Sequence, residues 1–247
     1  AVQRLAKNEK LQDEVNEINK KLDSGEDKKL NELWKKTRRL SLDSLEVIYK
    51  DLNTKFDKYY FESEVEQLGK KIVVDLLKKK IAKVSDGATI VDLEKENMGV
   101  WVLLRSDGTV LYSAKDLALA EEKFKDSKLD KSFYVVANEQ DLYLKQLVKT
   151  LKLSKFKGAD KIKHVSYGVV RLPTGKMSSR TGDNILYSDF KKEIVDYAKK
   201  QISDRFKLSK VELEKRALAV AVAAIKYSML KQTANKNLVF DKTQALK

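Results

Sequence analysis

Apolar side chains recur at helical spacing over about the first 83 residues, and this periodicity constrains the fold more than any other feature of the chain. A first helix is expected to end at Ser24-Gly25, a second to cover roughly Leu30 to Leu52, and a third to start near Glu64. The apolar positions that define the first helix are Leu5, Leu11, Val15, Ile18 and Leu22. The pattern predicts a helical region at 1–83.

Beyond Asp86-Gly87 the pattern changes to short β-rich runs that alternate with helical stretches. The turn residues Ser106–Thr109 predict a hairpin between Leu103-Leu104 and Val110-Leu111. The other expected elements are strands at Ala88–Leu93 and Val100–Leu104, a helix at Ala114–Phe124, a buried strand at Phe133–Ala137, a helix at Asp141–Leu151 and a strand at His164–Leu172. This strand, helix, strand order predicts a crossover in a parallel sheet and therefore an α/β fold.

A loop and two helices are expected at the end of the chain. The loop, 173–183, begins with the single proline of the sequence. One helix should start near Ser188, a plausible N-cap, and the other after Ser209, where Glu212 completes a capping-box pattern. The body of the last helix, Ala217–Leu230, is apolar on nearly every side, which predicts that it is buried.

Composition excludes several kinds of chemistry. The chain has no Cys and one His, His164, so thiolate metal sites, Cys nucleophiles and centres with several His ligands are excluded. No apolar run approaches the roughly 18 residues of a membrane span, and a cytoplasmic protein is expected. A net charge of +14 suits a polyanion such as nucleic acid, but the Lys residues are scattered, so a Lys-rich surface explains the charge equally well.

The loop at 173–183 carries the most informative residues. Two glycines bracket Lys176 and Arg180, with hydroxyls between them, and such a loop can fold over a triphosphate and stabilise charge on a leaving pyrophosphate. The alternative is an ordinary solvated connection between a strand and a helix. However, Lys176-Met177-Ser178-Ser179-Arg180 resembles the signature loop of class I aminoacyl-tRNA synthetases, Lys-Met-Ser-Lys-Ser, with Ser179 in place of the second Lys. The resemblance implies that these five residues form the catalytic loop.

Tyr112 and Asp116 lie four residues apart and would share one face of a helix. Such a pair could bind a guanidinium, or it could be a core Tyr and an Asp that interacts with the helix dipole. The segment is similar to the arginine pocket of arginyl-tRNA synthetases, and this implies that both residues bind the arginine side chain. Asn138–Asp141 follow a strand, where ligands bind in open α/β sheets or where a carboxylate can cap the next helix. The resemblance implies that Gln140 also contacts arginine.

The stretch before the loop, His164 to Val170, resembles the corresponding stretch of arginyl-tRNA synthetases. The resemblance implies an ATP site near His164, Gly168 and Val169, completed by Lys176 and Met177. A His buried at a strand end is the alternative for His164. Its role as a general base is not required, because aminoacylation proceeds mainly through positioning and charge stabilisation.

The resemblance extends from about Leu30 to the end and implies the second half of a Rossmann-like, class I synthetase fold. The expected regions are a helical connecting region at 1–83, the second half of the catalytic core at 84–187, and helices at 188–247 that lead toward an anticodon-binding domain. The family's His-x-Gly-His motif cannot be present in a chain with one His, so we expect a central fragment that is inactive in charging by itself.

The resemblance implies an arginine–tRNA ligase whose substrates are arginine, tRNA(Arg) and ATP with Mg²⁺. It also implies a monomer that has no permanently bound cofactor and does not associate with a membrane. Two alternatives remain at this point. One is a non-catalytic RNA-binding or scaffold relative of a synthetase, which the charge and the missing motif favour. The other is a class I synthetase for another amino acid, such as cysteine or lysine, against which the pair Tyr112 and Asp116 argues.

Overall fold

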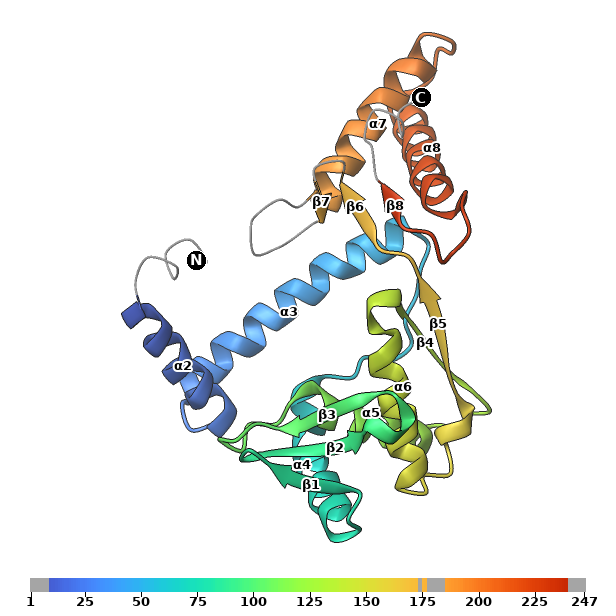
Figure 1. Ribbon diagram of the computed structural model, residues 1–247. Coiled ribbons are helices and arrows are strands. Elements are labelled where there is room, and N and C mark those ends of the chain that lie inside the picture. The colour runs from blue at the N-terminus through green and yellow to red at the C-terminus, as the bar shows by residue number, and fades with distance from the viewer. Residues whose placement is uncertain (1–8, 173–174, 177–184, 240–247) are drawn as a thin grey trace. The chain divides into compact units, whose positions relative to one another are not determined.

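The computed structural model describes residues 9–172, 175–176 and 185–239 (Figure 1). The chain divides into two compact units. The first comprises residues 1–56, 170–231 and 239–247, and the second comprises 57–169 and 232–238. The predicted regional boundaries at 83 and 187 stay predictions. Helices and short sheets confirm the α/β class, and none of the described helices is long and apolar enough to cross a membrane.

The first unit begins with two helices that match the predicted positions. Helix α2 (Glu9–Ser24) ends where Gly25 adopts a φ of +71°. Helix α3 (Lys28–Asp51) starts after Asp27, whose carboxylate accepts a hydrogen bond from the Leu30 N–H at 2.9 Å. No residue of α3 is fully buried among the described residues, although several of its side chains, such as Trp34 and Ile48, are half-buried.

Helices α7 (Tyr187–Ser203) and α8 (Lys210–Leu230) form the apolar core of the first unit. Ser209 caps α8 as predicted and accepts a hydrogen bond from the Glu212 N–H at 3.2 Å. The buried core residues are Phe190, Ile194, Val195, Ala198, Ala217, Ala221 and Ile225. Strands β6 (Val170–Leu172) and β7 (Gly175–Lys176) pair antiparallel in the same unit.

Two predictions about these helices are wrong. Leu186, not Ser188, is the N-cap of α7, and no side chain caps this helix end. The body of α8 is not buried all round, because α7 covers one stripe of it, and Tyr227 and Leu230 are 72% and 77% exposed. The apolar composition of a helix therefore does not predict how much of its surface other elements cover.

The second unit starts with α4 (Glu62–Lys78) and an antiparallel sheet in the order β1-β2-β3. The strands are β1 (Ala82–Ser85), β2 (Ala88–Leu93) and β3 (Gly99–Leu104). Asp86 and Gly87 both have positive φ, as in the tight turns that join hairpin strands. Strand β1 was not predicted as an element of its own, and it begins at Ala82, within two residues of the expected end of the helical region. Its four residues give too little pattern to identify a strand.

The predicted crossover is confirmed in the second half of this unit. Strand β4 (Ser132–Ala137) pairs in parallel with β5 (Ile162–Tyr167), and α6 (Asp141–Leu153) connects them. Strand β4 is not buried on both faces as predicted, because Phe133 and Val135 are 59% and 62% exposed. In the described chain, helices cover one face of this two-stranded sheet only.

The strand predicted at His164–Leu172 is two strands, because the ladder of β5 ends at Tyr167 and β6 begins at Val170. The intervening N–H groups bond elsewhere: Gly168 donates to the Ala234 carbonyl at 2.7 Å, and Val169 donates to Asn237 Oδ1 at 3.0 Å. A Cβ atom on Gly168 would lie 2.2 Å from the Lys236 carbonyl oxygen, so only glycine allows this close approach.

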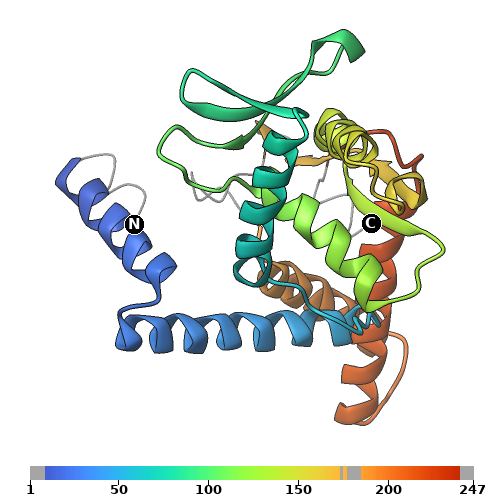
Figure 2. The same cartoon turned by 90° about the horizontal axis from the view of Figure 1, so that it is seen from below.

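Helix α5 (Tyr112–Asp126) packs side by side with α4, and Gly69 permits their close approach (Figure 2). A Cβ atom on Gly69 would lie 2.9 Å from the backbone carbonyl oxygen of Ala114 in α5. This contact sets the distance between the two helices and with it the position of α5.

We expect Gly69→Ala to lower the free energy of unfolding by roughly 1–3 kcal/mol, because the clash with backbone outweighs the better helix propensity of Ala. Denaturant unfolding followed by circular dichroism measures this change. Lys70→Ala, at an exposed position on the same helix, is the control and should change stability by less than about 0.5 kcal/mol. An equal or higher stability of Gly69→Ala would contradict the close approach.

Candidate active site

The start of α5 is fixed by the turn that precedes it. Arg105 N–H donates to the Thr109 carbonyl at 3.0 Å, and Leu104 and Val110 form a bridge, so the predicted turn is confirmed although no second strand follows it. The chain then enters α5 at Tyr112. Tyr112 is therefore on the first turn of the helix, with Asp116 one turn later on the same side.

Tyr143 of α6 joins these two predicted arginine-binding residues. Its hydroxyl donates a hydrogen bond to Asp116 Oδ2 at 2.5 Å. Its ring centroid lies 5.0 Å from that of Tyr112. The structure thus brings Tyr112 and Asp116 together around Tyr143, a residue to which the sequence analysis gave no role. The available signal was an aromatic side chain three residues after Gln140, on the helix that follows the strand end.

The Asp116 carboxylate is a partly buried charge with no salt bridge to any described residue. Burial raises its pKa above the ordinary 3.8, while the Tyr143 hydrogen bond and the charge of Lys123 oppose this shift. Lys123 lies over the ring of Tyr134, 4.3 Å from the ring centroid, and burial lowers its own pKa. Among the described residues no cation forms a salt bridge with Asp116, so the site could accept a cation from outside.

Gln140 lies where the sequence places it, after the carboxyl end of β4. It ends a short 3-10 helix (Asn138–Gln140) and is the N-cap residue of α6, with an exposed side chain. Tyr143 belongs to the first turn of the same helix. Gln140 therefore directly precedes the helix that carries the hydrogen-bond partner of Asp116, although no hydrogen bond joins Gln140 to Tyr112 or Asp116 among the described residues.

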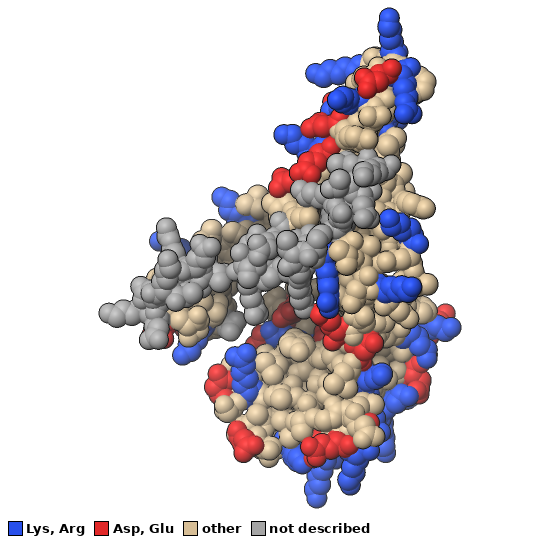
Figure 3. Space-filling view, turned by 45° about the horizontal axis from the view of Figure 1, so that its top comes forward, with Lys and Arg blue, Asp and Glu red and all other residues tan. Residues whose placement is uncertain are grey.

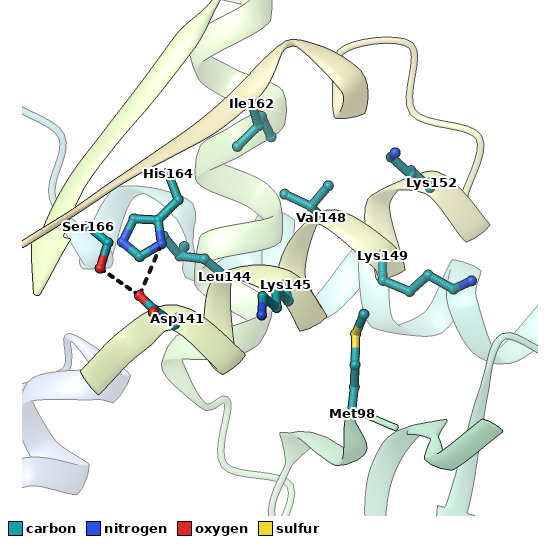
Figure 4. Close-up of a pocket in the computed structure, with 10 residues that line it drawn as sticks. All are labelled: Met98, Asp141, Leu144, Lys145, Val148, Lys149, Lys152, Ile162, His164 and Ser166. Carbon is teal, nitrogen blue, oxygen red and sulfur yellow. Dashed lines mark hydrogen bonds and ion pairs between the residues drawn. The ribbon is translucent and has the colours of Figure 1, made fainter. Parts of the chain in front are cut away.

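His164 lies at one end of a cavity of about 390 Å³ between α6 and β5 (Figure 4). Its Nδ1 is 3.4 Å from Asp141 Oδ1, which also accepts a hydrogen bond from Ser166 Oγ at 2.8 Å. Its Nε2 is 3.2 Å from the Val136 carbonyl oxygen. The remaining lining residues are Met98, Leu144, Lys145, Val148, Lys149, Lys152 and Ile162. Apolar side chains, with the Asp141 cluster at one end and Lys149 and Lys152 at the other, suit an organic ligand that also carries polar groups.

The other predicted nucleotide-binding residues are described only in part. Gly168 and Val169 use their N–H groups within the chain, so these donors are not free. The backbone of Lys176 belongs to β7, but its side chain lies outside the described residues. Met177, Ser178, Ser179 and Arg180 lie outside the described residues as well, and their predicted role stays a prediction.

Charged side chains of both signs are interspersed on the face drawn in Figure 3, with uncharged surface between them. Lys and Arg form no single block among the described residues of that face. Several Lys and Arg side chains of the described chain lie in ion pairs, such as Lys149 with Glu96 at 3.0 Å and Lys152 with Asp160 at 2.7 Å. On this face the described Lys and Arg residues are scattered, in agreement with their scatter along the sequence.

Comparison with known proteins identifies the class to which this fold and site belong. Two solved structures share the fold: an arginyl-tRNA synthetase from Thermus thermophilus (TM-score 0.76, 22% identity, 99% of this chain and 47% of that one) and one from Plasmodium falciparum (TM-score 0.74, 23% identity, 91% and 38%). The family described as tRNA synthetases class I (R), catalytic domain, matches residues 1–242. The chain belongs to this family, the catalytic domain of class I arginyl-tRNA synthetases.

Curated relatives agree with this assignment. An arginine–tRNA ligase from Bdellovibrio bacteriovorus is 39% identical over 218 residues, which are 87% of this chain and 38% of the relative. Another from Treponema denticola is 35% identical over 240 residues, which are 96% of this chain and 41% of the relative. The chain thus spans about two fifths of the length of these relatives.

We expect Asp116→Asn to raise the free energy of unfolding at pH 7. Because the folded-state pKa of Asp116 is raised, ionisation costs the folded state free energy; this cost is absent below pH 3.8 and fully present above the folded-state pKa. The neutral amide removes the cost, so the two stabilities should converge as the pH falls below 3.8. Denaturant unfolding at several pH values measures the difference.

Asp126→Asn provides the matched comparison. Asp126 is exposed, and the Lys58 ammonium lowers its pKa, so its amide variant should be less stable than the wild-type protein at pH 7. A lower stability of Asp116→Asn at pH 7 would contradict the assignment of Asp116 as a costly buried charge.

Proposed function

We propose that the full-length protein that contains this sequence attaches arginine to tRNA(Arg). The arginine carboxylate attacks the α-phosphate of ATP, giving arginyl-adenylate and pyrophosphate. The arginyl group then moves to the terminal ribose of the tRNA, and AMP leaves. The observation that carries this proposal is the partly buried Asp116 carboxylate, which accepts a hydrogen bond from Tyr143 beside Tyr112 and has no ionic partner among the described residues.

Arginine is the amino acid that this pocket suits best. A guanidinium has five N–H donors in one plane and stays protonated, so it can pair with a carboxylate even where water is largely excluded. Asp116 would take this charge, and the Tyr112 ring and the Gln140 amide would contact the rest of the side chain. A neutral amino acid would leave the buried carboxylate unpaired, which costs free energy and gives selectivity.

The ATP substrate is assigned to the other predicted residues. The triphosphate, which would bind together with Mg²⁺, would be contacted by Lys176, Met177, Ser178, Ser179 and Arg180. Cations and hydroxyls at this place would stabilise the charge that develops on the departing pyrophosphate. His164, Gly168 and Val169 would border the adenosine, and the nearby cavity between α6 and β5 is consistent with an organic ligand on this side.

A second candidate function is RNA binding without catalysis. The net charge of +14 favours it, because a cationic surface binds phosphates whether or not chemistry follows. Such a protein would bind tRNA with an affinity that falls steeply with salt but would not consume ATP.

The decisive assay is tRNA charging by the full-length protein with each of the twenty amino acids. We expect charging with arginine only. Asp116→Ala should lower kcat/KM for arginine by at least roughly 100-fold, because it removes the partner of a desolvated charge. Tyr112→Phe should lower it by roughly 2- to 10-fold through the loss of one polar contact. Asp75→Ala, an exposed carboxylate of α4, is the control.

Charging with a different amino acid would contradict the arginine assignment. Salt-sensitive tRNA binding without charging by any amino acid would favour the RNA-binding candidate.

A further inference from the structure

Tyr143 contacts both Asp116 and Tyr112, the two residues assigned to arginine, yet the sequence patterns give it no role. We propose that Tyr143 is a positioning residue: its hydroxyl orients the Asp116 carboxylate so that the free oxygen faces the substrate guanidinium. This inference rests on the proposed arginine-dependent function and concerns the selectivity of that same site.

The two carboxylate oxygens of Asp116 have different surroundings. Oδ2 accepts the Tyr143 hydroxyl at 2.5 Å, whereas Oδ1 has no hydrogen bond within the described chain. A carboxylate that rotates freely would lose entropy when a ligand fixes it. Anchoring one oxygen to the protein removes part of this cost before arginine arrives.

The Tyr143 ring is itself held in place by two aromatic neighbours. It packs edge-on against Trp101, with centroids 5.6 Å apart and an angle of 63° between the planes. Trp101 is a buried residue of the sheet β1-β2-β3. The ring centroid of Tyr112 lies 5.0 Å from that of Tyr143. The hydroxyl is therefore attached to a ring that the core fixes, and its hydrogen bond can transmit that fixed position to Asp116.

Tyr134 shows that a buried phenol in this region does not find a partner automatically. Its hydroxyl is buried and has no hydrogen bond in the structure. Burial raises the pKa of both phenols, so both keep their protons at neutral pH and can donate. Only Tyr143 has an acceptor. The pair thus offers the same chemical group with and without the contact on which the proposal depends.

The test is Tyr143→Phe in the full-length protein, measured as arginine-dependent charging. The Phe ring keeps the packing against Trp101 and Tyr112, so thermal unfolding should show a folded protein. We expect KM for arginine to rise by roughly 10-fold, with kcat and KM for ATP nearly unchanged, because the variant loses one hydrogen bond to a charged acceptor. Tyr134→Phe, the matched control, should leave KM for arginine unchanged.

The pH profile separates positioning from packing. The Tyr143 hydrogen bond lowers the pKa of Asp116, so its removal raises that pKa further. Arginine binding needs the ionised carboxylate, and the rise of KM on the acid side should therefore occur at higher pH in Tyr143→Phe than in the wild-type protein. A change in packing alone would raise KM without moving this profile.

A further readout needs no substitution. In the wild-type protein, the NMR signal of the Asp116 carboxyl carbon should respond to added L-arginine. A Tyr143→Phe protein with the wild-type KM and pH profile, or an Asp116 signal that does not respond to arginine, would overturn the inference. A wild-type protein that charges no arginine would instead refute the proposed function, so the two failures are distinguishable.

Discussion

The parallel pairing of β4 with β5 is the constraint on which the second unit depends. Parallel neighbours need a crossover, and here α6 provides it by burying Leu144, Leu147 and Leu151 against the common core. Polar residues on the remaining surface of the first turn of α6 contact two different neighbours. Asp141 turns toward His164 and Ser166 on β5, while Tyr143 meets α5 at Asp116. One helix thus organises both the proposed nucleotide side and the proposed amino-acid side of the site.

The proposed amino-acid side illustrates how a binding site would oppose stability. The folded chain keeps a carboxylate in a poorly solvated place, where its pKa is raised and no ionic partner from the described chain compensates it. Packing elsewhere offsets this cost, including the tight contact of Gly69 with α5 and the apolar core around Leu117 and Leu147. A ligand with a permanent planar cation would relieve the cost, and binding and selectivity would then have the same physical origin.

Sequence periodicity predicted the long helices and the crossover because local spacing determines both. It missed β1, where four residues give too little pattern, and it overestimated the burial of β4 and α8, because burial depends on neighbours that local sequence does not specify. It joined β5 to β6 because Gly168 and Val169 donate their hydrogen bonds to residues 66 and 68 positions away. Motifs brought Tyr112 and Asp116 to attention, but the contact with Tyr143 spans 27 positions and became visible only in three dimensions.

The central claim is that Asp116 pairs with the positive charge of the substrate, and binding of L-arginine compared with L-citrulline tests it most directly. Citrulline has nearly the same shape but carries a neutral urea in place of the guanidinium. Calorimetry on the full-length protein should show arginine binding and citrulline binding at least roughly 100-fold weaker, with the difference much reduced in Asp116→Asn. Equal affinities for the two ligands in the wild-type protein would contradict the account.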